Sequence, residues 1–308
     1  MKLLITLILS SATFLSLAQF KEPGSESAQQ FKDRKILFVE DFMGNEQGRV
    51  WFKKHWRFKH EIRYVTAETI AKMVKEKRTD ALIMTARTRA EAMVTGSHTE
   101  QKEMFVMAVY LSEDIKKAEK HNIDLKKKDE IFKLSTLGKP TSEAGYKFIG
   151  QHFYNHLNSA FGKEGNKDFT KIDAKFTTTL SSKTLYIAKS MVGASEAALK
   201  AIYGMPLKVV DDVVLEKAIM SNEANVAYVN VFFSDDMFGA AIIVIHASTG
   251  KTILECGTDF KKLEYDPNAT SSSSKLPFPV AEFKFGEAQA KNLKAEYDKA
   301  SKKAGKGK

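Results

Sequence analysis

The chain has 308 residues, of which 43% are hydrophobic and 10% aromatic, and its formal net charge is +10. This composition can fill the cores of one large or two ordinary domains, so we expect a globular protein. Its single cysteine, Cys256, excludes an internal disulfide and, being far from the N-terminus, an N-terminal lipid anchor.

Residues 1–18 have the pattern of a cleavable secretory signal. Lys2 precedes a short apolar run, and small residues at Ser16 and Ala18 place the expected cut after Ala18. The alternative is a retained membrane anchor, but Ser10 and other polar residues interrupt the run, which is shorter than the roughly 20 apolar residues of a spanning helix. We therefore expect a periplasmic or secreted protein without a transmembrane segment after cleavage.

A polar leader at residues 19–34 precedes the first expected strand, residues 35–40, which ends in a turn. A helix is expected at 47–55, with Val50 and Trp51 facing a sheet. Residues 51–63 mix basic and aromatic side chains, as a surface for single-stranded nucleic acid or a membrane would. Because an exported protein seldom meets nucleic acid, we expect no such partner.

In residues 63–161 the sequence predicts first a strand at 63–65 and then a helix capped by Thr66. This helix has an apolar stripe of Ile70, Met73 and Val74. Further expected elements are strands at 80–85 and 104–111 with a polar segment between them, a solvated helix within 112–130, and a helix from Thr141 or Ser142 to about 161.

The second half predicts a β-rich segment at 173–182 and a helix at 193–203. A second helix follows Asp211 as N-cap, and Gly250 is expected to supply a positive φ in a hairpin turn. Four strands are expected here, at residues 183–187, 207–210, 226–233 and 240–246. Residues 264–279 read as a linker, in which Asn268 has the form of a glycosylation site, and 280–303 as a short strand and a helix.

A pattern at residues 35–85 returns 148 to 145 residues later, at 183–230. Lys35, Leu37 and Met43 meet identical residues there, and the order strand, helix, strand recurs. This predicts an α/β protein of two similar units, each a mixed sheet with helices packed on it, plus a C-terminal helix. We place the first domain at 35–138, the second, as an internal repeat, at 139–263, and a linker, short strand, helix and basic tail at 264–308.

No nucleotide or hydrolase motif is present. The chain lacks Gly-x-Gly-x-x-Gly, a P-loop and a Gly-x-Ser-x-Gly elbow, and the histidine pair His152 and His156 has no third ligand in view. We therefore expect no cofactor and no metal. No catalytic residue can be assigned.

Ligands of α/β sheets bind at the carboxyl ends of strands. In the first unit those ends carry Glu40, Asp41, Arg87 and Arg89, which are the candidate ligand-binding residues. The alternative is that they are exposed loop charges.

The second unit resembles a known family in its order of elements, strand, helix, strand, helix, strand and then a hairpin around Thr249-Gly250-Lys251. It looks like the small α/β domain of bacterial envelope-assembly proteins, including the curli secretion lipoprotein and the amino-terminal domain of the Tol propeller protein. Those relatives often carry a lipidated cysteine, which this chain lacks. The resemblance implies a non-catalytic module that contacts envelope partners.

Three functions stay open at this point. The favoured hypothesis is an exported binding or scaffolding protein whose partner is an envelope protein or, through the basic tail at 299–308, a cell-wall or lipid surface. The alternatives are a two-lobed periplasmic solute-binding protein and a hydrolase. The oligomeric state is open.

Overall fold

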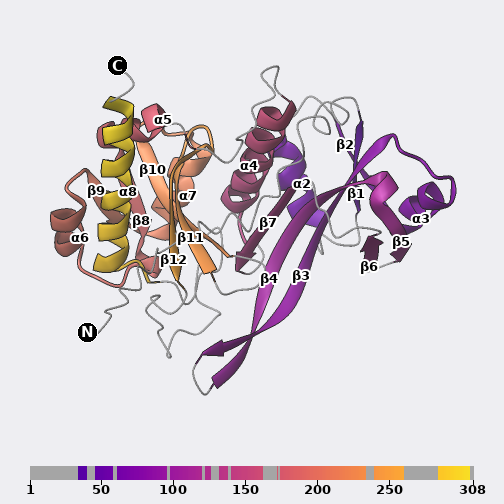
Figure 1. The fold of residues 1–308 in the computed structure, drawn as a ribbon, viewed down its shortest axis with the longest axis horizontal. Helices are drawn as coiled ribbons and strands as arrows, with labels where there is room; N and C mark the ends of the chain where they lie inside the picture. Colours follow the sequence, from indigo (N-terminus) through magenta and orange to yellow (C-terminus); the bar gives the residue numbers. More distant parts are fainter. Residues whose placement is uncertain are drawn as a thin grey trace, which may run out of the picture.

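The computed structural model describes residues 34–39, 46–57, 61–95, 98–119, 122–125, 132–137, 140–161, 172, 174–233, 239–259 and 284–305. These residues form two mixed sheets covered by helices, which confirms the expected α/β class (Figure 1). The expected signal segment and the linker with Asn268 lie outside the described residues.

The first unit is built on a sheet of strand order β2-β1-β3-β4-β7. β1 pairs in parallel with β2 and β3, and the β3/β4 and β4/β7 pairs are antiparallel. The strands are β1 Lys35–Val39, β2 Ile62–Val65, β3 Ala81–Thr95, β4 His98–Leu111 and β7 Phe132–Leu137. The helices are α2 Glu46–His55, α3 Ala67–Lys75 and α4 Glu143–Phe161, and a small hairpin joins β5 Ile115–Glu119 to β6 Asn122–Leu125.

The second unit has a sheet of order β12-β11-β10-β8-β9. Read from β9, it has the same strand order and pairing directions as the first sheet read from β2. Its strands are β8 Thr184–Ala188, β9 Leu207–Val210, β10 Val226–Phe233, β11 Gly239–His246 and β12 Thr252–Asp259. Its helices are α5 Ala174–Thr178, α6 Glu196–Tyr203, α7 Asp212–Met220 and α8 Glu287–Gly305. The bounds of β9 and α7 each lie 145 residues after those of β2 and α3.

The two units lie side by side with the same orientation, so that layers of helices and sheets alternate across the molecule (Figure 1). The β5/β6 hairpin and α3 lie on the outer face of the first sheet, and α6 and α8 lie on the outer face of the second. Between the sheets lie α2, α4 and α7. Buried side chains of both units form one continuous core through this middle layer.

Several helix caps, buried helix faces and turn residues lie where the sequence predicted them. The Thr66 side chain accepts a hydrogen bond from the backbone of Thr69 at the start of α3, and the stripe residues Ile70 and Met73 are buried. Gly250 has φ +66°, as its turn requires. Asp211 is at the N-cap of α7 but makes no side-chain cap bond, because its carboxylate pairs with Lys189 at 3.0 Å.

The charged segment expected as a helix within 112–130 instead contains β5 and β6. A register irregularity between Ile115 and Lys117 lets Ile115 and Ala118 both face the core beneath α3, where both are buried. This contact with the sheet and α3 outweighs the helical propensity of the lysines and glutamates.

Residues 173–182, expected to be β-rich, are helical where described, as α5 and a 3₁₀ turn at Thr179–Ser182. Hydroxyl groups explain the difference, because those of Thr178, Thr179, Ser181 and Ser182 each donate to a carbonyl three residues back. Thr178 bonds to Lys175 at 2.7 Å and Ser182 to Thr179 at 2.8 Å. Local hydrogen bonds thus override the β propensity of threonine.

Two further expectations were wrong in detail. The strand expected at 80–85 extends to residue 95, and the strand expected at 104–111 already begins at residue 98. The polar residues between the two expected strands pair with each other as a hairpin. Val50 does not face the sheet and is 54% exposed. The phase of α2 is set by Phe52, which packs against Phe38 with ring centroids 5.6 Å apart.

Helix α4 directly follows the boundary that the sequence predicts between the two units. This helix follows the last strand of the first sheet and packs beside α2, as α8 follows β12 and packs beside α6. Helix α4 thus holds the place in the first unit that α8 holds in the second, and the domain bounds at 138/139 stay a prediction.

Candidate functional site

Two features set this fold apart from a pair of independent α/β units, a projecting hairpin and a filled junction. The hairpin is long because β3 and β4 pair from Leu82–Leu111 to Thr95–His98. β1 pairs with β3 at Ala81–Met84, and β7 with β4 at Met104–Val109. Residues 87–95 and 98–103, which we call the arm, therefore extend past both neighbours (Figure 1).

The arm contains two of the four residues singled out from the sequence. Arg87 lies opposite Val106 and Arg89 opposite Met104, within β3 rather than beyond its end. Glu40 and Asp41 lie outside the described residues. Arg87 and Arg89 thus belong to a projecting strand, and the expectation that they follow a strand end was wrong because β3 is longer than expected.

The junction is filled by α4, which packs against α2 of the first unit and against α7 and β10 of the second. On the side of the second unit, Phe148 contacts Tyr228 of β10 edge-to-face and Phe232 of β10 at a tilt, with ring centroids 6.4 and 5.7 Å apart. His152 lies 5.1 Å from the Phe232 ring. All four side chains are buried, so this interface has the packing of a domain core.

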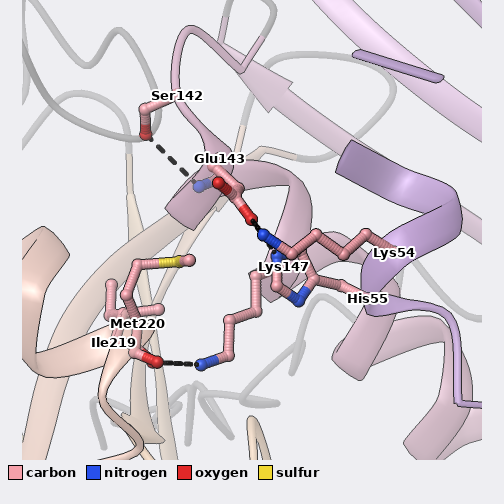
Figure 2. Close-up of polar contacts among 8 residues, drawn as sticks. Lys54, His55, Ser142, Glu143, Lys147, Ile219 and Met220 are labelled. Carbon is pink, nitrogen blue, oxygen red and sulfur yellow. Dashed lines mark hydrogen bonds and ion pairs between the residues drawn. The ribbon is translucent and has the colours of Figure 1, made fainter. Parts of the chain in front are cut away.

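A buried lysine on α4 ties the two units together (Figure 2). Lys147 is 2% exposed, and its ammonium donates to the carbonyl of Ile219 and, at 3.0 Å, to that of Met220. These carbonyls end α7, where the helix dipole favours a cation. Burial lowers the pKa of Lys147 to about 8; repulsion from Arg57 acts in the same direction and attraction to Glu143 opposes it.

At the start of α4, one carboxylate holds the end of α2 (Figure 2). Glu143 Oε1 lies 2.7 Å from Lys54 Nζ and 2.8 Å from His55 Nε2. The Lys54 hydrogen bond lowers the pKa of Glu143, against burial, and His55 adds to the lowering. Burial lowers the pKa of His55 although its bond to Glu143 opposes this. Neutral His55 then donates its Nε2 proton to the carboxylate.

The last described contact of α4 is with the β11/β12 turn. Asn155 Nδ2 donates to the carbonyl of Thr249 at 3.2 Å. A Cβ built on Gly250 would lie 2.5 Å from the Cβ of Gln151, so only glycine fits beneath the helix. The glycine is therefore required by both the turn and the junction.

A histidine and two hydroxyls meet in the same turn. His246 Nδ1 lies 3.0 Å from Ser248 Oγ and 3.1 Å from Thr249 Oγ1, and Nε2 lies 3.0 Å from the carbonyl of Ala224. Nε2 donates to the carbonyl, so Nδ1 is an acceptor. A base next to a hydroxyl is also found in nucleophilic sites. Here the two hydroxyl contacts close the turn and the Nε2 bond ties it to the segment before β10, so we assign them a structural role.

Cys256 is 3% exposed, and burial raises the pKa of its thiol to about 12. The thiolate is the reactive form, so this thiol is inert at neutral pH. The interpretation of Cys256 as a small buried hydrophobe agrees with this environment.

Sequence reasoning missed Lys147, which is the most distinctive charged group of the described junction. A signal was present, because this lysine stands between Tyr146 and Phe148 in a helix rich in aromatic residues. A charged residue inside an apolar helix face often has a buried partner.

Comparisons with protein-family models, with curated proteins and with solved structures found no match for the chain. Among the described helices, none is long and apolar enough to cross a membrane.

Proposed function

We propose that this chain is an exported protein of the bacterial cell envelope that works by binding or scaffolding. The observation that carries the proposal is the arm, a two-stranded projection on a body whose two units share one core. Such a body holds the arm in a fixed direction. The backbone of an open strand edge is a known platform for partner chains.

Export is supported by the pattern of residues 1–18, in which a short apolar run follows Lys2. The element order of the second unit, from β8 to β12, agrees with the order on which the resemblance to envelope-assembly domains rests. The first unit has this order too. We infer that the two units are copies of one ancestral domain, with β5 and β6 added to the first.

The packing of α4 disfavours the solute-binding alternative. A two-lobed binding protein holds its ligand between the lobes, but here the space between the sheets contains Phe148, His152 and other buried side chains of α4. A ligand at the junction would have to displace this helix. Binding at an outer surface requires no such change.

An arm-shortened variant tests the proposal. Because Arg89 lies opposite Met104, residues 90–103 can be replaced by an Asn-Gly turn to give a short hairpin like that of the second unit. Both proteins are used for affinity capture from envelope extract, with cross-linking and mass spectrometry. We expect the intact chain to capture a reproducible partner and the variant, with an unchanged melting temperature, to lose it.

A small-molecule thermal-shift screen runs beside the capture. A ligand at 100 times its Kd adds about 2.7 kcal/mol to the free energy of unfolding. If capture returns no partner while one small molecule raises the melting temperature of both proteins, the scaffold proposal is abandoned for a solute-binding role. Export is tested by sequencing the N-terminus of the secreted or periplasmic chain, which should begin at Gln19.

A further inference from the structure

We propose that the arm also pairs with the arm of a second copy of this chain. In this dimer the two β3 strands run antiparallel, and Ala90 of each copy lies on the two-fold axis. Four strands, two from each arm, then form one continuous ribbon between the two bodies.

The first argument is the open edge of β3. In the described part of the chain, no strand lies beside residues 87–95 on the side away from β4. Natural proteins keep such edges short or covered, because unpaired backbone groups attract other strands. The corresponding edge of the second unit is shorter, since β10 continues past β8 only from Val229 to Phe233, and β10 and β11 have 8 residues each, against 15 and 14 in β3 and β4. The longer edge of the first unit therefore points to a partner strand.

The second argument is charge complementarity, which selects one register. Centred on Ala90, an antiparallel pair puts Arg89 of each copy opposite Glu91 of the other, so opposite charges meet twice. Centring the pair on position 89 would put two arginines face to face, although Arg87 would then lie opposite Glu91 on each side, and centring it on 91 would put two glutamates face to face. The register centred on Ala90 differs from both in having opposite-charge pairs and no like-charge pair between residues 87 and 93.

The charge pattern continues into β4. Within one arm, Glu91 lies opposite Lys102. A line across the proposed ribbon therefore meets Lys102 and Glu91 of one copy and then Arg89 of the second copy. The signs of these three charges alternate. The interface is isologous, so it closes as a dimer and does not propagate into a filament.

Cysteine cross-linking tests the register. In the proposed dimer, the two Cα atoms at position 90 face each other at about 4.5 to 5.5 Å, within reach of a disulfide. Residue 92 of one copy lies opposite residue 88 of the other, so the two Cα atoms at position 92 are separated by four residues along the strand, or about 13 Å. A disulfide cannot bridge this distance. We expect Ala90→Cys to form a covalent dimer under mild oxidation and Ala92→Cys to stay uncoupled. The native Cys256 is buried and does not compete.

A charge reversal tests the pairing without a covalent bond. Arg89→Glu replaces two attractive pairs by two repulsive ones and should weaken dimerisation by about tenfold or more in sedimentation equilibrium. Adding Glu91→Arg to the same chain restores opposite charges at both positions, and we expect it to recover most of the loss.

The proposal fails if the purified chain sediments as a monomer at high micromolar concentration and neither cysteine variant cross-links. It also fails if Arg89→Glu and the double variant dimerise equally well. If the arm-shortened chain loses a captured envelope partner while Ala90→Cys stays monomeric, the edge takes a strand from another protein. That result would overturn the dimer and leave the binding function standing, so the two failures are distinct.

Discussion

Helices α4 and α8 each have 19 residues and take the same place in their units, yet their surroundings differ. Counted from the first residue, Tyr146 and Ile149 of α4 correspond to Ala290 and Leu293 of α8, and all four are buried. The next positions diverge. Lys147 and Phe148 are buried, whereas the corresponding Lys291 and Asn292 are exposed.

On α8 this face of the helix is exposed to solvent. On α4 the corresponding face binds the second unit. Lys147, Phe148, Gln151 and Asn155 make the contacts to α7, β10 and the β11/β12 turn. The same helix position thus serves as shared core in one unit and as an end cap in the other. This division is typical of stacked repeats, whose terminal elements need a polar outer face.

The largest expected difference between the two helices is at Phe148. Phe148→Ala removes a fully buried ring between Tyr228 and Phe232 and should lower the free energy of unfolding by about 3–5 kcal/mol. The matched change Asn292→Ala on α8 should alter it by less than about 0.5 kcal/mol. Urea unfolding measures both, and equal losses would contradict the shared role of α4.

Gly250 and Gly204 give a second matched pair. Both have a positive φ, +66° and +69°, so alanine adds a backbone strain of about 1–2 kcal/mol at either. At Gly250 the new Cβ also meets Gln151 of α4 at 2.5 Å, while at Gly204 the nearest of the surrounding atoms, in Lys294, is 3.7 Å away. Gly250→Ala should therefore cost a further 1–3 kcal/mol, about the usual cost of overpacking. Equal unfolding midpoints for the two variants would mean that α4 does not press on the turn.

Lys147 and Lys291 compare the same residue type at corresponding positions. Lys147→Met leaves the carbonyls of Ile219 and Met220 without this donor, at a cost of about 1–3 kcal/mol in unfolding free energy. Lys291→Met, at an exposed site, should change it by less than about 0.5 kcal/mol. A loss at Lys147 no larger than at Lys291 would show that the buried ammonium contributes nothing to the junction.

The smallest effect is a pH dependence at His55. Because burial holds its pKa in the folded chain below 6.5, the unfolded chain takes up the proton first as the pH falls. Stability should therefore decline below pH 6.5, down to the folded pKa. Glu143, whose pKa is lowered from 4.5, adds a separate loss at more acid pH.

His55→Gln keeps an N–H donor near Glu143 but does not titrate. In urea titrations across pH 7 to 3, this variant should show a smaller decline below pH 6.5 and keep the loss below 4.5. Part of the first decline should persist, because burial also lowers the pKa of His246. An unchanged profile would mean that His55 contributes nothing to the first decline.

The sequence predicted those parts of the fold that depend on local pattern. Thr66, the stripe of Ile70 and Met73, and the recurrence of strand, helix and strand led to the correct class and to two similar units. Residues 112–130 were misread because burial of Ile115 and Ala118 beneath α3 is a tertiary effect. The junction was not predictable, since Lys147 and its carbonyl partners lie 72 and 73 residues apart. Of the candidate site residues, Arg87 and Arg89 lie within β3, whose full length the sequence did not predict, and their role in binding a ligand stays a prediction.

Unfolding followed separately in the two units tests most directly whether α4 joins them into one core. Both tryptophans, Trp51 and Trp56, lie in or next to α2, so their fluorescence reports on the first unit. Amide hydrogen exchange of β10 and α7, measured by mass spectrometry at the same urea concentrations, reports on the second. A shared core predicts that both signals change at one urea midpoint, and that Phe148→Ala lowers both together. Two well-separated midpoints in the unaltered chain would contradict it.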